Sequence, residues 1–575
     1  MLKKLAYGSL VLLLCVLIAL TGCSTENSGK GESAEPSGQG TQGQGTEEGS
    51  GYTAVGTYPI VKDKITMSIF TRQDPKIEDY TTNEYTKYYE EKTNIHVDWQ
   101  TVPTAALAEK LQVTLAGGKL PDVIMNAGLT PSQVVAYGSQ GIFIPLNDLI
   151  DKYAPNIKQM MELSPDSKKY MYTPDGNIYG IPRFSGMMRH SRLPFKLWMN
   201  KTWLDKLNLE VPSTTEELYN VLKAFKTQDP NGNGKQDEVP YAGSAENAFD
   251  PYDYPDSYLM QSFIFYDRDN YVMVEDGKII FAADKPGFKE GLKYMHRLVS
   301  EGLLLPESFT QDRKAMTALA ENPDANLLGA GTSLWWGFFT VPDGPRYNEY
   351  IPVSIMAGPD GKRYGLDRGD STRPADFVIT KDAKDPIAAI RWLDHFYDKQ
   401  NETMFKTGWS PTYGQEGKHW EKVDKPGEVG IDGKTKVTFR ILVTPGTAGN
   451  YYWNQTVPSW SSDETQEWLG TYEVTPEMEM ERVLYRTTVD MYLPYSNLEK
   501  KLPFMYFMPE DLTKFGDLQT NITNTVQQFL LRFVTGSMDI EKDWNKYLKE
   551  LESAGLQQYL EVLQKTYDMN QQSKQ

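Results

Sequence analysis

The chain contains little cysteine and little histidine. Of its 575 residues only Cys15 and Cys23 are cysteines, and both lie close to the N-terminus. A disulfide framework, a thiol nucleophile and a cysteine metal site are therefore excluded from the whole chain after Cys23. The five histidines form no H-E-x-x-H zinc motif, and no G-x-S-x-G sequence supplies a serine nucleophile.

Basic residues are outnumbered by acidic ones. The chain has 59 Lys and Arg residues against 77 Asp and Glu residues, which gives a formal net charge of −18. Nucleic acids and anionic lipid surfaces both attract basic faces, so this balance argues against either as a partner. The length is sufficient for two lobes with separate cores.

Long hydrophobic runs are confined to the N-terminus. The apolar run Leu10 to Leu20 follows Lys3 and Lys4 and is too short to span a bilayer, as is typical of a secretory signal. Leu20-Thr21-Gly22-Cys23 then matches the lipobox at which a lipoprotein signal is cleaved. We predict a signal peptide at residues 1–22 and a lipid on Cys23. The protein would then lie on the extracellular face of the cell membrane, attached through the lipid alone.

Residues 23–56 form the next segment and are rich in Gly, Gln, Ser, Thr and Glu. Such a composition cannot bury enough apolar surface to offset the entropy lost on ordering. We therefore predict a flexible tether, with a root-mean-square span of about 30 Å for about 30 residues.

Strand and helix patterns alternate from residue 64 onward. Lys64–Phe70, Ile95–Trp99 and Asp122–Met125 are predicted strands; Asn83–Lys92 and Ala105–Ala116 are predicted helices. A second unit begins with a predicted strand at Leu197–Asn200 and a helix at Thr202–Leu207, and a capping box at Ser213-Thr214-Thr215-Glu216 opens a further helix. This alternation predicts the α/β class with a largely parallel sheet.

Two polar residues follow predicted strands directly. Arg72 lies just beyond the first strand and Asn126 just beyond Asp122–Met125. Ligands of parallel sheets bind beyond the carboxyl ends of the strands, so both residues are candidates for ligand contact. The alternative is that Arg72 is an ordinary surface residue and Asn126 a turn former.

A calcium-binding pattern follows the helix that contains Leu218 and Phe225. Oxygen-bearing side chains occupy positions 1, 3, 5 and 9 of an EF-hand-like loop, glycine occupies position 6, and position 7 offers its backbone carbonyl. The predicted ligands are Asp229, Asn231, Asn233, Lys235 through its carbonyl, Asp237 and Glu238. Pro240 stands where an EF-hand has its bidentate glutamate, so Glu238 would have to compensate. The alternative is a metal-free Asn-Gly turn.

Several short motifs, in their order along the chain, resemble the extracellular solute-binding lipoproteins of carbohydrate ABC importers. They are the lipobox and tether, Leu120-Pro121-Asp122-Val123, Trp203-Leu204-Asp205-Lys206-Leu207, Asp276-Gly277-Lys278, Tyr413-Gly414-Gln415-Glu416-Gly417-Lys418-His419-Trp420 and Phe533-Val534-Thr535-Gly536. The loop from Asp229 to Glu238 resembles that of the alginate-binding members of this family. The likeness extends over nearly all of residues 60–570.

The resemblance implies a two-lobed, periplasmic-binding-protein-like fold with a hinge between the lobes. We place lobe 1 at residues 57–185 and 348–408, and lobe 2 at residues 186–347 and 409–575. It further implies a monomer, without enzymatic activity, that binds an oligosaccharide, passes it to ABC importer permease subunits and holds a structural calcium ion.

Sugar recognition needs aromatic rings against the pyranose C–H faces and polar groups on the hydroxyls. The candidates are Trp335, Trp336, Asp370, Arg373, Trp409, Tyr413, Tyr452 and Trp453. Trp336 and Trp453 are the foremost candidates, and their replacement by alanine is expected to weaken binding without unfolding the protein. Core packing is the alternative for each aromatic residue, and Trp392 and Trp544 are predicted to be core.

Two other functions remain open on the sequence. A peptide-binding or sensor-coupled lipoprotein would share the same leader and tether. A secreted carbohydrate-active enzyme would use paired carboxylates, which 77 acidic residues supply by chance.

Overall fold

The structure is a computed structural model of the whole chain. It describes residues 51–185, 192–245, 253–342, 344–369, 371–398, 402–423, 439–443, 448–454, 456–460, 469–471 and 476–572. The chain divides into two compact units, Met1–Gly49 and Ser50–Gln575. The second unit contains all of the helices and strands named below. The predicted signal peptide, Cys23 and most of the tether lie outside the described residues.

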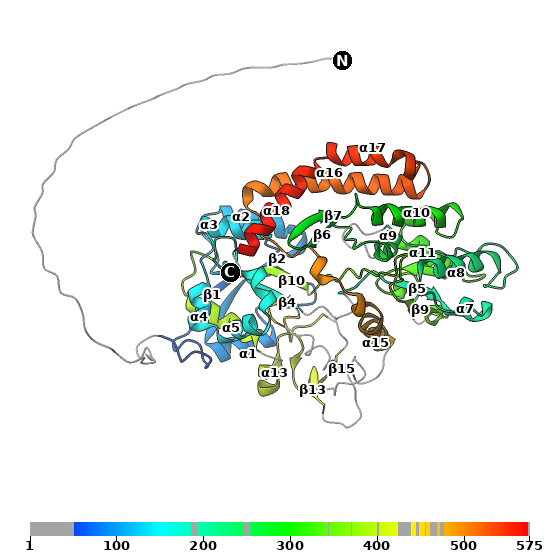
Figure 1. Cartoon of the computed structure of the whole chain (residues 1–575). Helices are drawn as coiled ribbons and strands as arrows, with labels where there is room; N and C mark the ends of the chain where they lie inside the picture. The colour runs from blue at the N-terminus through cyan, green and yellow to red at the C-terminus, as the bar shows by residue number, and fades with distance from the viewer. Residues whose placement is uncertain are drawn as a thin grey trace, which may run out of the picture. The chain divides into compact units, whose positions relative to one another are not determined.

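The first lobe is built on a mixed five-stranded sheet (Figure 1) with the strand order β2-β1-β3-β10-β4. The strands are β1 (Ile65–Gln73), β2 (Ile95–Pro103), β3 (Val123–Met125), β4 (Ile181–Ser185) and β10 (Ser371–Ile379). Strand β1 pairs in parallel with β2 and β3, whereas β10 is antiparallel to β3 and β4. Successive residues of β1 face opposite ways: Ile69 packs into one core and Phe70 into another. Both faces of the sheet are therefore covered.

Helices cover this sheet. They are α1 (Glu84–Thr93), α2 (Leu107–Ala116), α3 (Pro131–Ser139), α4 (Asn147–Tyr153), α5 (Pro155–Leu163), α6 (Lys168–Met171) and α12 (Pro386–Asp394). The predicted strands and helices of this region are confirmed, with ends that differ by a few residues. Helix α2 ends at Gly117, as its sequence predicted.

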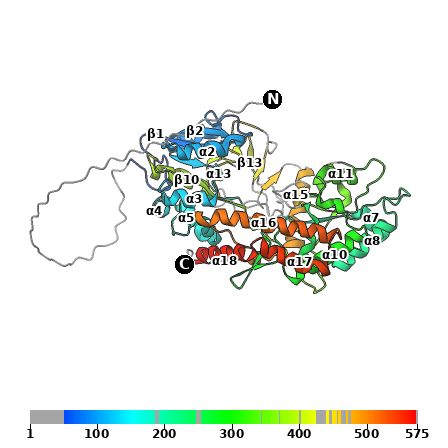
Figure 2. The same ribbon diagram turned by 90° about the horizontal axis from the view of Figure 1, so that it is seen from above.

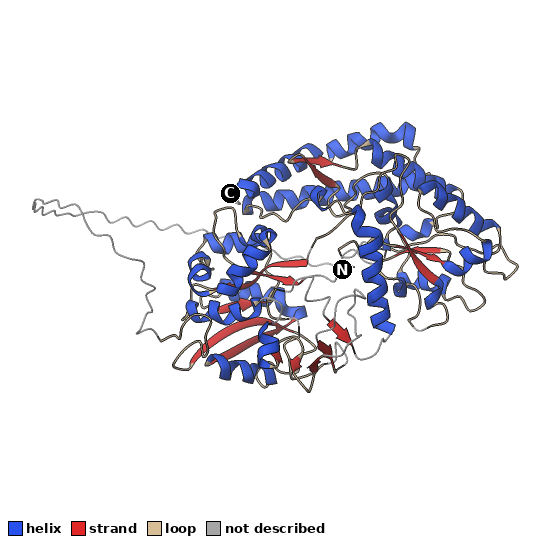
Figure 3. Cartoon of the chain, turned by 60° about the horizontal axis from the view of Figure 1, so that its bottom comes forward, coloured by secondary structure: helices blue, strands red, loops and turns tan. Residues whose placement is uncertain are grey.

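The second lobe has a smaller antiparallel sheet with the order β8-β5-β9, and Figure 3 shows the two sheets in separate layers of helices. Its elements are β5 (Leu197–Asn200), β8 (Ala330–Thr332), β9 (Tyr350–Val353), the hairpin β6 (Val272–Glu275) and β7 (Lys278–Phe281), and helices α7 (Lys201–Leu207), α8 (Thr215–Thr227), α9 (Pro255–Leu259), α10 (Pro286–Ser300), α11 (Arg313–Ala320) and α15 (Pro476–Arg486). The antiparallel pairing in this lobe departs from the parallel arrangement that the alternating pattern predicted.

The capping box of α8 is shifted by one residue from its predicted position. Thr214 is the N-cap, its side chain accepts a hydrogen bond from the Glu217 backbone N–H, and the Glu217 side chain accepts from the Thr214 backbone. Ser213 also donates to Glu217 through its hydroxyl at 2.8 Å. The sequence Ser-Thr-Thr-Glu-Glu satisfies the motif in two registers, and the structure uses the later one.

Three C-terminal helices connect the lobes: α16 (Pro509–Val534), α17 (Ile540–Ser553) and α18 (Leu556–Gln572). Figure 2 shows α16 and α18 side by side, and α16 contacts both α3 of the first lobe and α10 of the second. Before α16, the Tyr506 hydroxyl donates to the Tyr170 carbonyl at 2.7 Å, and its backbone N–H donates to the Asn570 side chain at 2.9 Å. Among the described residues, no helix combines the length and apolarity needed to cross a membrane.

Segments before and after β10 are distributed differently from the predicted lobe boundaries. Strand β9 pairs with β5, so residues 350–353 belong to the second sheet and not to the first lobe. Residues 448–460 instead pack on the first lobe, where Gly449 pairs with Ile77 and Trp460 with Phe184. The chain between α12 and α15 contains six further small elements: α13 (Glu402–Thr407), β11 (Trp409–Ser410), β12 (Gly414–Gln415), β13 (Trp420–Lys422), β14 (Phe439–Ile441) and β15 (Leu469–Thr471).

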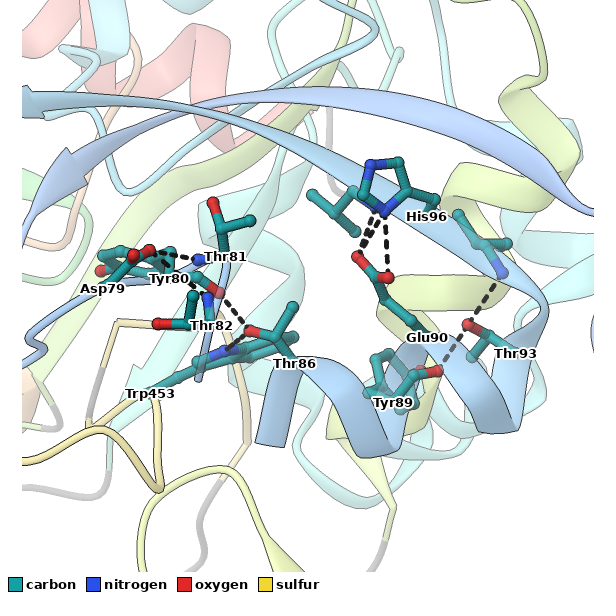
Figure 4. Close-up of polar contacts among 12 residues, drawn as sticks. Asp79, Tyr80, Thr81, Thr82, Thr86, Tyr89, Glu90, Thr93, His96 and Trp453 are labelled. Carbon is teal, nitrogen blue, oxygen red and sulfur yellow. Dashed lines mark hydrogen bonds and ion pairs between the residues drawn. The ribbon is translucent and has the colours of Figure 1, made fainter. Parts of the chain in front are cut away.

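Trp453 is part of the core of the first lobe (Figure 4). It is 1% exposed, and its indole N–H donates to the Thr86 hydroxyl at 2.7 Å. The Thr86 hydroxyl in turn donates to the Tyr80 carbonyl at 2.6 Å. The rings of Tyr85 and Trp392 lie 4.8 and 5.7 Å from the Trp453 ring, centroid to centroid. Trp453 thus fastens residues 448–460 to α1.

Trp336 is also a core residue. It is 5% exposed and lies 4.6 Å from Trp198, ring centroid to ring centroid. The predicted core position of Trp392 is confirmed, since it is fully buried, whereas Trp544 is partly buried and packs against the second-lobe core. The burial of Trp336 and Trp453 runs against the expectation that either can become alanine without loss of stability.

We predict that Trp453→Ala lowers the free energy of unfolding by about 3–5 kcal/mol, the usual effect of removing a large buried aromatic ring. Guanidinium denaturation followed by far-UV circular dichroism measures the change. Trp335→Ala is the matched control, because Trp335 is only partly buried, and its midpoint should move much less. Equal midpoints for Trp453→Ala and the unmodified protein would refute the core assignment.

Candidate functional site

The carboxyl-end edge of the first-lobe sheet gathers the predicted polar residues. Arg72 is the penultimate residue of β1 and Asn126 directly follows β3. Strand β10 runs antiparallel to β3, so its first residues project beyond the end of β3, where Arg373 stands opposite Arg183 of β4. The structure therefore brings Arg72, Asn126 and Arg373 to one edge, the one at which parallel sheets bind ligands.

A β-bulge in β10 shapes this edge. The pairing of β10 with β4 shifts register between Arg373 and Phe377, and Ala375 has a φ of 52°. Asn126, with a φ of 51°, donates its backbone N–H to the Asp376 carbonyl at 2.8 Å. Bulges redirect side chains, and left-handed backbone at non-glycine residues is concentrated at functional sites.

Gly180, just before β4, permits this bulge. A Cβ at residue 180 would lie 2.5 Å from the Cβ of Ala375, far inside van der Waals contact. The absence of a side chain at residue 180 is thus required for β10 to bend toward β4.

The carboxylate of Asp376 lies in the electrostatic field of three nearby arginines. The charges of Arg183, Arg373 and Arg72 all act to lower the pKa of Asp376, but burial outweighs them and raises it to about 6. Burial also lowers the pKa of Arg183, and repulsion from Arg373 and Arg72 adds to the effect. The edge is therefore positive in a chain that is acidic as a whole.

Several polar atoms at this edge are buried without a hydrogen-bond partner. They are the Nε of Arg72, the Nδ2 of Asn126, the Oδ2 of Asp376 and the hydroxyls of Thr71 and Thr372. The Asn126 side chain is 3% exposed and accepts from Arg373 Nη1 at 3.3 Å through its oxygen, so its amide donors remain unused. A buried polar group without a partner costs about 1–3 kcal/mol. A bound polar ligand would supply the missing partners.

A second polar group lies beside Trp335 in the other lobe. Ser333, which follows β8, donates to Asp253 at 2.8 Å, and the Asp253 carboxylate also pairs with Arg313. The Arg313 guanidinium lies 4.1 Å from the centroid of the Phe338 ring. Trp335 is half-buried and donates through Nε1 to the Tyr347 hydroxyl at 3.1 Å. This group combines the Arg313–Asp253 ion pair with the partly exposed ring of Trp335.

Of the remaining predicted aromatic residues, Trp409 and Tyr452 pack on the first lobe, and Tyr413 packs in a separate small core with Trp420 and Phe439. Trp409 stacks on Tyr88 with ring centroids 4.9 Å apart, and Tyr452 stacks on Tyr451 at 4.5 Å. Tyr413 packs against Phe439, and burial raises its pKa to about 12. Asp370 lies outside the described residues.

Arg183, Asp376, Asp253 and Arg313 are absent from the sequence-based set of candidates. Arg183 lies within Ile181-Pro182-Arg183-Phe184, which carries no motif, and becomes notable only because β4 places it opposite Arg373. A possible signal for Asp376 was its place at the start of an apolar strand segment, where a buried carboxylate is uncommon.

A cavity of about 570 Å³ adjoins the polar edge at Thr372 and extends along the segments that cross between the lobes. Its lining includes Lys169, Phe184, Arg192, Arg368, Lys501 and Phe504, and none of the predicted site residues. Arg192 is already held by Asp367 at 2.8 Å and Arg368 by Asp269. We regard it as the space around the crossing segments and not as the ligand site.

The predicted calcium loop folds as a series of turns in which side-chain oxygens accept backbone N–H groups. Asp229 accepts from Gly232 and Gly234, and the Asn233 oxygen accepts from Lys235 at 2.8 Å. The amides of Asn231 and Asn233 donate to Asp237 at 3.1 Å. Within the described part of the chain no three His, Cys, Asp or Glu side chains are gathered as a metal-binding group.

The environment of Glu238 indicates whether the loop can hold a cation. Both of its carboxylate oxygens are buried without a hydrogen-bond partner. Burial raises its pKa, and the charges of Asp229 and Asp237 raise it further. A divalent cation would compensate this carboxylate, and the side-chain oxygens nearby are the hard donors that calcium prefers. The residues present therefore fit calcium.

The two lobes, the crossing segments and the polar edge define a two-lobed binding protein. Residues 74–403 match the family described as bacterial extracellular solute-binding protein. The chain belongs to this family.

Similar proteins agree with this assignment. The fructooligosaccharide ABC transporter substrate-binding protein FusA of Streptococcus pneumoniae is 29% identical over 525 residues, which cover 90% of this chain and 93% of FusA. The polygalacturonan/rhamnogalacturonan-binding protein YtcQ of Bacillus subtilis is 32% identical over 194 residues, covering 34% of this chain and 36% of YtcQ.

Solved structures share the fold over most of the chain. FusA in complex with kestose has a TM-score of 0.63 at 28% identity, covering 88% of this chain and 99% of FusA. An EF-hand mutant of FusA with fructo-nystose has a TM-score of 0.62 at 26% identity, with the same coverage of both chains. A solute-binding protein of Bifidobacterium longum subsp. infantis has a TM-score of 0.70 at 25% identity, covering 90% and 99%.

Proposed function

We propose that this protein captures an oligosaccharide outside the cell and delivers it to the permease subunits of an ABC importer. The observation that carries the proposal is the set of buried, unpartnered donors at the edge formed by Arg72, Asn126 and Arg373. Sugar hydroxyls and ring oxygens are the acceptors that such donors bind. The family and the binding of a fructooligosaccharide by FusA support the same function.

The capture involves no chemical step. We infer that the ligand binds to the polar edge of the first lobe and that the second lobe closes over it with Trp335, Ser333 and Arg313. Trp335 offers an accessible ring for the C–H face of a sugar, whereas Trp336 and Trp453 support the fold from the cores. The protein would act as a monomer, since one chain supplies both halves of this site.

We predict that an oligosaccharide raises the melting temperature of the chain from residue 24 onward in a dose-dependent manner. A thermal-shift screen of neutral and acidic oligosaccharides of two to six sugar units measures it, with short peptides as controls and calcium present. A ligand at 100 times its Kd stabilises the folded state by about 2.7 kcal/mol. Chromatography of the incubated sugar should show no product. Stabilisation by peptides alone would favour a peptide-binding protein, and cleavage of the sugar would favour an enzyme.

We also propose a structural calcium ion in the loop from Asp229 to Glu238. The ligands would be Asp229, Asn231, Asn233 and Asp237 through side chains, Lys235 through its carbonyl, and Glu238. The residue after this loop is tied to the second-lobe core, because the Val239 backbone N–H donates to the Leu327 carbonyl at 2.8 Å. Calcium would thus hold α8 against the segment that borders β8. The EF-hand mutant of FusA supports this interpretation.

Calcium is expected to raise the melting temperature relative to a chelator, and Asp237→Asn to abolish most of that difference. Asp148→Asn is the matched control, because its side chain is 88% exposed and lies on α4 of the first lobe, away from the loop. Differential scanning calorimetry in calcium and in EDTA measures both variants. The same melting temperature in both solutions for the unmodified protein would contradict the proposal.

The lipid anchor is a further part of the proposed function. A lipid on Cys23, followed by a tether, would keep the protein at the extracellular face of the membrane near its permease partners.

Cys23→Ser should release the protein into the culture medium, whereas Cys15→Ser should leave it attached to the membrane. Cys15 lies within the predicted signal and would be removed with it. Fractionation of cells fed a labelled fatty acid measures both the attachment and the label. Label on the Cys23→Ser variant would refute the assignment of the lipid to this residue.

A further inference from the structure

Arg72 and Arg373 lie at the same sheet edge, and neither forms an ion pair with any described residue. Several arginines elsewhere are paired with carboxylates: Arg192 with Asp367, Arg268 with Asp256, Arg297 with Glu216 and Arg313 with Asp253. The chain has 77 acidic residues from which such partners could come. The feature of this edge is that it places two guanidiniums without an ion-pair partner close to one buried amide, that of Asn126.

The surroundings of these two arginines favour an acidic partner over a neutral one. The Nε of Arg72 is buried and donates to no described residue, and Arg373 donates to the Asn126 oxygen at 3.3 Å. Asp376 is the carboxylate that acts on this group from within the bulge, and it faces three guanidiniums. A hydroxyl could accept their hydrogen bonds but would leave the positive charge uncompensated. This is unfavourable at Arg72, which is partly buried, whereas Arg373 is exposed and free to turn its guanidinium toward a ligand.

Asn126 adds a neutral donor to the same place. Its Nδ2 is buried without a partner among the described residues, while its oxygen is oriented by Arg373. The position of Asn126 is held by its backbone hydrogen bond to Asp376. The edge thus presents two guanidiniums and one amide, all of them donors, and the planar fork of a guanidinium matches the two oxygens of a carboxylate.

We propose that the edge formed by Arg72, Asn126 and Arg373 binds the carboxylate of a uronic acid unit, so that the cargo is an acidic oligosaccharide. This inference rests on the proposed function and narrows it. One carboxylate oxygen accepts from Arg373, the other from Arg72, and the Asn126 amide donates to either oxygen or to a neighbouring hydroxyl. The overall negative charge of the protein does not oppose this, because the charges near the ligand dominate at short range.

Isothermal titration calorimetry with matched ligands tests the proposal. The probes are trigalacturonate and trimannuronate, the methyl ester of each, kestose and nystose as neutral sugars, and a sulfated disaccharide. We expect at least one uronate to bind and its methyl ester to bind about 10- to 100-fold more weakly, which corresponds to the loss of one charge-assisted interaction. Binding of the uronate should also weaken as salt rises.

Two variants identify the residues. Arg373→Gln should weaken uronate binding about 10- to 100-fold and weaken binding of the methyl ester much less, because the uncharged ester loses only a neutral hydrogen bond. Arg346→Gln is the control, because Arg346 donates to the Asn322 carbonyl in the second lobe and lies outside the proposed site. Equal melting temperatures of the two variants and the unmodified protein establish that both are folded.

The outcomes separate the two proposals. If neutral sugars bind and uronates do not, or if Arg373→Gln weakens acid and ester equally, the acidic cargo is refuted while oligosaccharide capture stands. Preference for the sulfated disaccharide would likewise refute a carboxylate. If none of these sugars binds and the thermal-shift screen also finds no sugar ligand, the proposed function itself fails.

Discussion

The insertion of β10 between β3 and β4 is the constraint on which the arrangement of the first lobe depends. The chain leaves this lobe after β4, builds the second sheet, and returns to place β10 in the middle of the first sheet. Because β10 runs antiparallel to β3, its beginning extends past the carboxyl ends of the parallel strands. The bulge at Ala375, fitted against Gly180, then turns Arg373 and Asp376 toward Asn126. A local backbone strain is thus maintained by the pairing on both sides of one strand.

The same return of the chain determines how the lobes are held. Residues 448–460 cross back onto α1 through Trp453, and the segment before α16 reaches the first lobe again through Tyr506. Helix α16 then contacts helices of both lobes. The polar edge therefore lies in a lobe assembled from distant parts of the sequence. The same strand order places positive charge at this edge: the guanidiniums of Arg72, Arg183 and Arg373 lie at the end of the first-lobe sheet, although the chain as a whole is acidic.

Much of the first lobe could be predicted from the sequence because its signals are local. Alternating polarity marked β1, the glycines after α2 marked its end, and the spacing of oxygen-bearing residues marked the loop from Asp229 to Glu238. Arg72 and Asn126 were identifiable because each lies at the carboxyl end of a strand. The aromatic residues were harder to assign, because the sequence does not distinguish a tryptophan that is accessible to a ligand from one in a core. Only their burial in the structure distinguishes Trp335 from Trp336 and Trp453.

The sequence by itself determined the family resemblance, the α/β class and the local elements, since hydrophobic periodicity, capping and short motifs act between residues a few positions apart. The tertiary structure alone decided that β9 joins the second sheet, that residues 448–460 complete the first lobe, and that Arg183 and Asp376 join Arg72, Asn126 and Arg373 at one edge. When two strands more than a hundred residues apart pair, the hydrophobic pattern of neither strand identifies the other. The charges of the site therefore become visible only when β10 has taken its place between β3 and β4.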